Sequence, residues 1–253
     1  MTAPVTIVIP VFNERPVLPE LQRRLDAVLA AAGERAELLF VDDGSDDGSG
    51  AWLEALAAED PRVSLLSLSR NFGKEAAVSA GLDHARGEAV IVIDADLQDP
   101  PELIPDLLRR WRDGFDVVYT VRASRRGESW LKVSSARWFY RVMGRLSAVP
   151  VPADAGDYRL LSRRAVEALR AMPEAHRYLK GLYAWVGFPQ ASITYHREAR
   201  AAGRSKWSYW RLWNHALDGI TSFSTAPLKL ATWLGLATST LAFLYGLYLL
   251  LRT

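Results

Sequence analysis

Carboxylate side chains follow successive apolar segments in the first half of this 253-residue chain. Asp42-Asp43-Gly44-Ser45 comes directly after one such segment, and Asp94, Asp96 and Gln98 come after another. Two carboxylates held close together repel each other unless a cation lies between them. Because magnesium commonly keeps one or two protein carboxylates and takes other ligands from substrate phosphates, the second group predicts a site for Mg²⁺ or Mn²⁺ and a nucleoside diphosphate. The first motif, taken alone, is more typical of a turn that caps a helix.

The common phosphate-binding loops are missing from the sequence. No Gly-x-Gly-x-x-Gly follows an apolar segment, and no Gly-x-x-x-x-Gly-Lys-Ser/Thr occurs anywhere in the chain. These loops hold the phosphates in dinucleotide-dependent dehydrogenases and in P-loop NTPases. The sequence therefore argues against both classes.

The carboxylates are expected at the carboxyl ends of parallel strands. Apolar segments alternate with segments of helical length, so that strands are predicted at residues 5–9, 38–41, 63–68, 89–93 and 117–121, and helices at 17–32, 50–58, 75–85 and 101–113. This alternation is typical of an α/β fold with a doubly wound, mostly parallel sheet. Ligands bind such sheets just outside the carboxyl ends of the strands.

Charge is distributed unevenly along the chain. Hydrophobic residues make up 49% of it and charged residues 24%, which excludes a disordered or fibrous protein, and the absence of Cys excludes disulfides and a Cys nucleophile. The net charge is only +2, yet residues 1–121 carry 11 Lys+Arg against 22 Asp+Glu, whereas residues 122–229 carry 19 against 7. The two halves are therefore expected to have different partners.

The two ends of the chain differ in hydropathy. The N-terminus has a short apolar run without a preceding basic region, so it predicts a buried strand and a cytoplasmic domain and not a signal peptide. Residues 230–251 carry no charge and are long enough to cross a membrane as a helix, although a buried core helix fits the same pattern. Either this is a single-span anchor, or further spans belong to the complete protein.

Seven motifs in order resemble family 2 glycosyltransferases of the GT-A fold. Within that family the chain is similar to the branch that makes polyisoprenyl-phosphate sugars, such as dolichol-phosphate mannosyltransferases and, more closely, bacterial bactoprenol glucosyltransferases. The motifs lie at residues 8–14, 41–48, 69–75, 94–101, 154–160, 200–207 and 217–224. These glucosyltransferases usually carry two membrane spans after the catalytic domain, and this sequence has one.

The resemblance implies roles for individual residues. The nucleotide sugar is expected to contact Pro10, Val11, Phe12, Glu14, Asp42 and Asp94. Asp96 is expected to be the principal metal ligand, with Asp94 and Gln98 beside it, so that Asp94 and Asp96 take part in catalysis. Asp157 matches the family carboxylate that is usually given the role of base. A phosphate acceptor is already anionic near neutral pH, however, so we expect Asp157 to orient the acceptor or to take up a residual proton.

The basic second half is expected to bind the acceptor and the membrane. Arg122, Lys132 and Arg137 are the candidates for contact with the acceptor phosphate, although each could equally be a solvated or lipid-facing charge. Trp residues beside basic residues in residues 206–217 predict an interfacial helix ahead of the apolar segment, with a core aromatic stripe as the alternative. Arg70 and Lys74 are expected either to touch phosphate or to cap the helix that follows them.

These patterns together predict a hexosyltransferase. It would transfer a sugar with inversion and with the help of a metal ion, from a nucleoside diphosphate sugar (UDP-glucose fits best) to undecaprenyl phosphate at the cytoplasmic face of the inner membrane. The expected parts are a catalytic domain at residues 1–196, a juxtamembrane segment at 197–227 and a transmembrane helix at 228–253. No nucleic-acid partner is expected, and a homo-oligomer is compatible with the sequence.

Two other hypotheses share the nucleotide motifs. A processive polysaccharide synthase should carry Gln-x-x-Arg-Trp on an acceptor-side helix, but Leu107 stands where Gln would precede Arg110-Trp111, and the match lies too early in the chain. A non-catalytic, sugar-nucleotide-binding membrane scaffold is the second alternative. It is disfavoured because the expected metal and nucleotide residues are all present.

Overall fold

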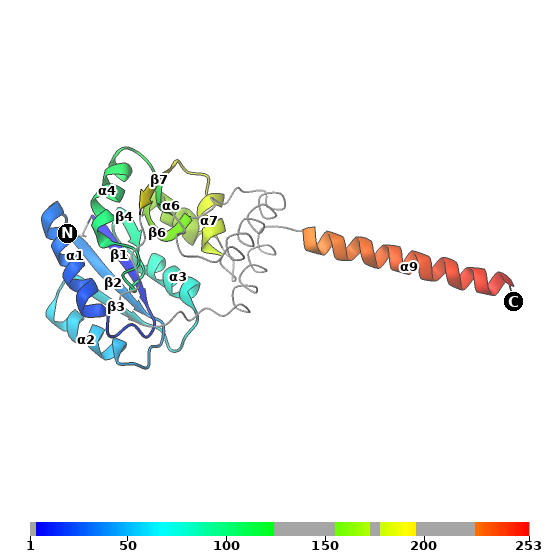
Figure 1. Ribbon diagram of the computed structural model, residues 1–253, viewed down its shortest axis with the longest axis horizontal. Coiled ribbons are helices and arrows are strands. Elements are labelled where there is room, and N and C mark those ends of the chain that lie inside the picture. Colours follow the sequence, from blue (N-terminus) through cyan, green and yellow to red (C-terminus); the bar gives the residue numbers. More distant parts are fainter. Residues whose placement is uncertain (1–3, 124–154, 173–177, 196–225, 253) are drawn as a thin grey trace.

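A seven-stranded sheet forms the centre of the protein. The computed structural model describes residues 4–123, 155–172, 178–195 and 226–252 (Figure 1). The strands lie in the order β3-β2-β1-β4-β6-β5-β7, and only β6 is antiparallel to its neighbours. Their bounds are β1 (Val5–Val11), β2 (Ala36–Asp42), β3 (Val63–Ser67), β4 (Ala89–Val92), β5 (Val117–Arg122), β6 (Ala155–Ser162) and β7 (Gln190–Tyr195). The predicted α/β fold with a mostly parallel sheet is confirmed.

Helices cover both faces of the sheet. Alternate residues of β1 serve the two faces: Ile7 and Ile9 belong to one buried cluster and Val8 to the other. The first cluster takes its helical residues from α1 (Leu18–Ala32), α2 (Ser49–Glu59), the 3₁₀ turn η1 (Pro101–Leu103) and α4 (Ile104–Arg112). The second takes them from α3 (Lys74–His84), α6 (Arg163–Arg170) and α7 (Leu179–Trp185). The sheet is therefore doubly wound.

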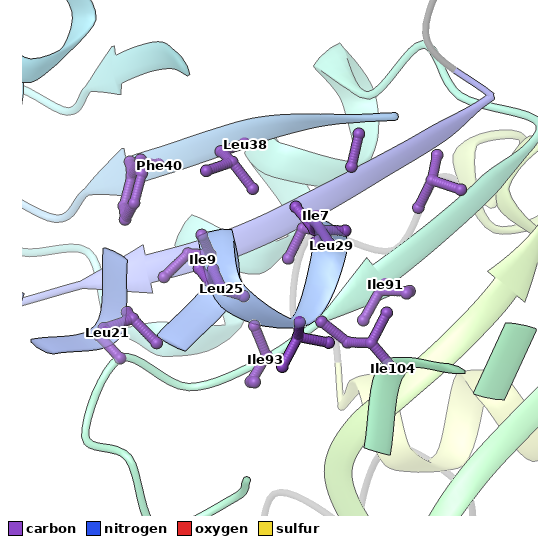
Figure 2. Close-up of a cluster of buried hydrophobic side chains, with 14 of the residues drawn as sticks. Ile7, Ile9, Leu21, Leu25, Leu29, Leu38, Phe40, Ile91, Ile93 and Ile104 are labelled. Carbon is purple, nitrogen blue, oxygen red and sulfur yellow. The ribbon is translucent and has the colours of Figure 1, made fainter. Parts of the chain in front are cut away.

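Helix α1 shows how the sequence fixes one layer. It has a proline in its first turn, which suits a helix start, and it ends at Gly33, whose φ of 63° is left-handed. Leu21, Leu25 and Leu29 recur every four residues and are buried over β1, β2 and β4, as Figure 2 shows. Each fully buried leucine stabilises the fold by about 2 kcal/mol. This packing holds the neighbouring strand ends in register.

The strand order reverses between β1 and β4. From β1 the chain moves outward through β2 to β3, and β4 then returns to the other side of β1. Strand β6 runs antiparallel to β4, with Arg159 opposite Val92. The first residues of β6 therefore reach the edge of the sheet where β1, β2 and β4 end. In open α/β sheets this switch point is where ligands bind.

The predicted elements of the first half are all present, with shifted bounds. Strands β1 and β2 run further than expected, to Val11 and Asp42, and the helix predicted at residues 101–113 is divided between η1 and α4. Strand β4 ends at Val92, so Asp94 and Asp96 lie beyond it and strand alternation does not relate their side chains. The antiparallel strand β6 was not among the predicted elements.

The C-terminal helix α9 (Ala226–Arg252) confirms the helix expected there. Its segment Ala231–Arg252 has the length and composition of a membrane span, and no other helix in the described part of the chain does. The threonine hydroxyls along this segment donate to carbonyl oxygens one turn earlier, at 2.8–2.9 Å, which satisfies their polar groups within the helix. The interfacial helices expected within residues 197–225 lie outside the described residues.

Candidate functional site

The loop after β1 is fastened to the loop after β2. The Asn13 amide donates to Ser45 Oγ at 2.9 Å, and the Glu14 amide donates to Ser49 Oγ at 3.2 Å. Asn13 has a φ of 56°, a left-handed conformation that Asn adopts more readily than most residues. These hydrogen bonds fix the backbone of residues 10–14 next to the end of β2.

The residues expected to contact the nucleotide sugar gather at the adjoining ends of β1 and β2. Val11 pairs with Asp42 in the sheet, and Asp42 Oδ1 accepts the Ser45 amide at 3.1 Å. The Val11 side chain is buried in the core, and its carbonyl oxygen accepts the Asp43 amide at 2.8 Å. A Cβ at position 50 would lie 2.8 Å from Asp42 Oδ2, so Gly50 leaves room for that carboxylate.

Asp43 ties the end of β2 to the start of α3. Its carboxylate is buried and accepts the amides of Phe72 at 2.7 Å and Gly73 at 2.9 Å. Gly44 has a φ of +71°, and a Cβ there would lie 2.6 Å from the carbonyl carbon of Arg70. The close approach therefore requires glycine. This connection fixes the backbone from which the Lys74 side chain extends.

Lys74 joins two carboxylates that come from distant parts of the chain. Its ammonium lies 2.7 Å from the Asp94 carboxylate, after β4, and 2.5 Å from Asp157 Oδ2, in β6. Lys180, at the start of α7, lies 3.2 Å from Asp157 Oδ1. The sequence had left open whether Lys74 touches phosphate or caps a helix. In the structure it pairs with the two site carboxylates, and its contact with phosphate stays a prediction.

This ion-paired group remains accessible from solvent. The side chains of Lys74 and Asp157 are 37% and 36% exposed, and those of Lys180 and Asp94 are 26% and 22% exposed. Each of the four side chains therefore keeps part of its surface in contact with solvent. Ion pairs that keep this much contact with water are weak stabilisers of the fold, which favours a role in binding over a role in stability.

Burial and neighbouring charges shift the pKa values of the ion-paired side chains of Asp157, Lys74 and Asp94. Desolvation raises the pKa of Asp157, but the ammonium groups of Lys74 and Lys180 outweigh it, so the pKa lies well below its ordinary value. Desolvation likewise lowers the pKa of Lys74, and the charges of Asp157 and Asp94 reverse that effect and raise it. Asp94 has its pKa raised by desolvation, against the opposing charge of Lys74. Asp157 and Lys74 are therefore charged at neutral pH.

Glu75 and Arg159 hold in place the backbone segments that carry the ion-paired side chains. The Glu75 carboxylate accepts the Leu179 amide at 3.3 Å and so links α3 to the start of α7. Desolvation and the charge of Asp157 raise the pKa of Glu75 to about 7. The buried Arg159 guanidinium donates to the Gly156 carbonyl oxygen at 2.6 Å and stacks 3.8 Å from the centre of the Tyr183 ring. Arg159 thus fixes the backbone of the β6 segment that carries Asp157.

The expected metal ligands lie on the loop after β4. Asp96 is buried, its Oδ1 accepts the Gln98 amide at 3.1 Å, and Leu97 between them has a φ of 57°. Across the residues that the structure describes, no three His, Asp or Glu side chains form a group able to hold a metal ion by themselves. The predicted set of Asp94, Asp96 and Gln98 holds only two carboxylates. That number suits a divalent ion that takes further ligands from substrate phosphates.

The expected acceptor residues are only partly covered by the structure. Arg122 ends β5 at the same edge of the sheet, but the placement of its side chain is not described. Lys132 and Arg137 lie outside the described residues. Lys180 was missed in the sequence, because it lies in a short helix without a motif. The sequence beside Lys180, including Tyr178 and Leu179, contains no pattern that predicts a contact between α7 and Asp157.

Comparisons with known proteins agree with this architecture. A protein from Synechocystis sp. described as an uncharacterized glycosyltransferase is 48% identical over 253 residues, which cover all of this chain and 80% of that protein. A prophage bactoprenol glucosyl transferase homolog from Escherichia coli is 43% identical over 249 residues, covering 98% of this chain and 81% of that protein.

A solved structure confirms the GT-A-like fold. A mannosyltransferase from Pyrobaculum calidifontis, in complex with GDP-mannose and Mn²⁺, superposes with a TM-score of 0.59 at 21% identity, over 88% of this chain and 64% of that one. The sequence model of glycosyl transferase family 2 matches residues 6–170, which contain all the strands that carry the site. The chain therefore belongs to glycosyl transferase family 2 and is a glycosyltransferase.

Proposed function

We propose that this glycosyltransferase transfers glucose from UDP-glucose to the phosphate of undecaprenyl phosphate, with inversion, at the cytoplasmic face of the inner membrane. The observation that carries the proposal is the combination, in one chain, of a family 2 site at the switch point of the sheet and an apolar helix of 27 residues. A donor soluble in water and an acceptor in the bilayer need these two parts. The relative named a bactoprenol glucosyl transferase homolog supports the choice of sugar and lipid.

The donor is expected at the ends of β1, β2 and β4. Pro10, Phe12, Glu14 and Asp42 would line the nucleoside pocket, with the buried Val11 side chain beneath it, and Asp94 would lie against the ribose. The hydrogen bonds between the loops after β1 and β2 support this assignment, because they give the pocket a fixed wall before the nucleotide arrives. Such preorganisation reduces the ordering that binding would otherwise require.

Asp96, Asp94 and Gln98 would hold the divalent ion, Mg²⁺ or Mn²⁺. Their oxygen atoms are the ligand type that both ions prefer, and the Mn²⁺ in the superposed mannosyltransferase supports the use of such an ion. When bound, the ion supplies positive charge that stabilises the departing diphosphate. Lys74 already contacts Asp94, so this chain contributes a second cation to the same region.

The acceptor phosphate is expected on the side of the site formed by β5, β6 and α7. Its second pKa is near 6, so it is largely a dianion at neutral pH and attacks the anomeric carbon without a strong base. The low pKa of Asp157 supports this view, because a carboxylate that holds its negative charge so firmly is a poor acceptor for a proton. Positioning and charge stabilisation would then supply most of the rate enhancement.

Turnover in detergent tests the proposal. The purified chain is incubated with undecaprenyl phosphate, Mg²⁺ or Mn²⁺ and a panel of UDP- and GDP-sugars, and both nucleotide release and lipid-linked sugar are measured. We expect lipid-linked glucose from UDP-glucose and none when the divalent ion is removed by a chelator. Lipid product from a different donor would correct the sugar, and nucleotide release without any lipid product would contradict the acceptor.

A further inference from the structure

The Asp157 carboxylate is paired with two lysine side chains. Its Oδ2 accepts a hydrogen bond from Lys74 on α3, and its Oδ1 forms an ion pair with Lys180 on α7. The two ammonium groups therefore lie on either side of one carboxylate. Without this carboxylate, two like charges brought to the same place would repel each other.

In the part of the chain that the structure describes, Lys180 forms one ion pair, with Asp157. The Lys180 side chain is 26% exposed, and its ammonium, which has three N–H donors, lies 3.2 Å from Asp157 Oδ1. The start of α7 is already fixed by the Leu179 amide, which donates to Glu75, and by the buried side chains of Leu179 and Leu182. The ion pair of Lys180 is therefore not required to dock the helix.

We propose that Asp157 is a positioning residue that holds Lys74 and Lys180 on either side of the reaction centre, and that Lys180 binds the phosphate of the acceptor. This inference rests on the proposed transfer to a lipid phosphate. It replaces the usual role of base at Asp157 with that of a counter-charge. The group it would recognise is a phosphate monoester dianion, which an ammonium binds through charge-assisted hydrogen bonds.

The arrangement assigns the two lysines to different sides of the site. Lys74 also contacts Asp94, which follows β4 beside the expected donor pocket. Lys180 contacts Asp157 from α7, on the opposite side of that carboxylate. Asp157 keeps both ammonium groups in place, and each ammonium offers a positive charge to a different phosphate. Lys74 would then face the departing diphosphate and Lys180 the incoming phosphate.

Steady-state kinetics of Lys180→Met and Lys180→Arg test the inference. With UDP-glucose saturating, we expect Lys180→Met to raise the KM for undecaprenyl phosphate by about tenfold or more and to change kcat by less than about threefold. Lys180→Arg should recover most of the affinity, because it keeps the charge. Arg170→Met, which removes a surface cation on α6 that pairs with Asp83 on α3, is the matched control and should leave KM unchanged. A kcat loss without a change in KM would overturn the assignment.

A double-mutant cycle then tests the role of Asp157. If this carboxylate acts through Lys180, the effects of Asp157→Asn and Lys180→Met on kcat/KM for the lipid should be strongly non-additive, and the double variant should resemble one single variant. Additive effects would overturn the link. Thermal unfolding of each variant, with shifts of only a few degrees expected, shows that the fold is retained.

Binding separates this inference from the proposed function. Undecaprenyl phosphate and undecaprenol are titrated into wild type and Lys180→Met in detergent, without a donor. We expect Lys180→Met to weaken binding of the phosphate lipid and to leave binding of the alcohol unchanged. Equal effects on both lipids would overturn the phosphate contact. If wild type binds the phosphate lipid through Lys180 but forms no lipid-linked sugar, the proposed function fails while the contact stands.

Discussion

The site carboxylates are held in two different ways. On the donor side, Asp42, Asp43 and Asp96 accept hydrogen bonds from backbone amides of their own or neighbouring loops, while Asp94 is paired with Lys74. On the acceptor side, Asp157 is paired with the ammonium groups of Lys74 and Lys180. The carboxylates held by backbone amides are buried, whereas the Asp157 side chain is about one-third exposed.

This difference separates a prebuilt donor site from an adjustable acceptor site. Backbone amides are fixed by the fold and cannot follow a ligand. Lysine side chains have several rotatable bonds, so their charges can move from a carboxylate to an arriving phosphate. A soluble nucleotide can bind in a rigid pocket. The phosphate of a lipid that enters from the bilayer binds more readily to cations on flexible side chains.

The largest effect is expected from Asp96→Ala. Loss of a metal ligand removes several kcal/mol of charge stabilisation from the transition state, so transfer should fall by about 10³-fold or more. The melting temperature without ligands should change little. The measurement is lipid-linked glucose formed per minute, with Glu54→Ala as the control because Glu54 lies exposed on α2. If the variant kept more than a tenth of the wild-type activity, the role of Asp96 as a metal ligand would be contradicted.

A smaller effect, on stability, is expected from Asp43→Ala. The variant leaves the amides of Phe72 and Gly73 without their buried acceptor, which should lower the free energy of unfolding by about 2–3 kcal/mol. Thermal or denaturant unfolding in detergent measures it. Asp46→Ala, whose exposed carboxylate accepts from Asn13 Nδ2, should cost less than about 1 kcal/mol. Similar losses for the two variants would show that burial of the donor-side carboxylates does not matter.

The smallest effect concerns the pH dependence of stability. Burial and the charge of Asp157 raise the pKa of Glu75 from 4.5 to about 7, so the folded state binds this proton more tightly than the unfolded state. The contribution of Glu75 to the free energy of unfolding should therefore fall as the pH rises from about 4.5 to 7, and it should stay constant above pH 7. Asp157 and Lys74 keep their charges across this range.

Glu75→Gln should remove that dependence. Relative to wild type, the variant should gain about 1–2 kcal/mol between pH 5 and pH 8, since one pKa unit corresponds to about 1.4 kcal/mol and Glu75 keeps partial contact with water. Unfolding at pH 5, 6, 7 and 8 measures the difference. Glu54→Gln, an exposed position on α2, controls for the loss of a carboxylate. A constant difference between Glu75→Gln and wild type at all four pH values would contradict the prediction.

The donor side could be predicted from the sequence because it is built from local patterns. Apolar runs predict the strands, and the parallel order of β1, β2 and β4 then brings the residues that follow them to one edge. The loop contacts of Asp42 and Asp96 stay within a few residues. The exact bounds differed, since β1 and β2 continue past their apolar cores, β4 ends at Val92 and the helix predicted at residues 101–113 is divided between η1 and α4.

The acceptor side could not be predicted in the same way. Asp157 reaches the site because β6 inserts antiparallel between β4 and β5, a pairing between segments more than 60 residues apart in the case of β4. Nothing in the local sequence specifies that partner. Lys180 lies on a helix of only seven residues, and its partner is known only once β6 and α7 have been placed. The ion pairs of Lys74 with Asp94 and Asp157 likewise join segments that are distant in the sequence.

The most direct test of this account compares wild type, Asp96→Ala and Asp157→Asn in one assay of glucose transfer from UDP-glucose to undecaprenyl phosphate. We predict lipid-linked glucose from wild type, almost none from Asp96→Ala, and reduced but measurable product from Asp157→Asn, whose rate recovers as the lipid concentration is raised. Loss of activity in Asp157→Asn as complete as in Asp96→Ala, with the fold intact and at saturating lipid, would contradict the account.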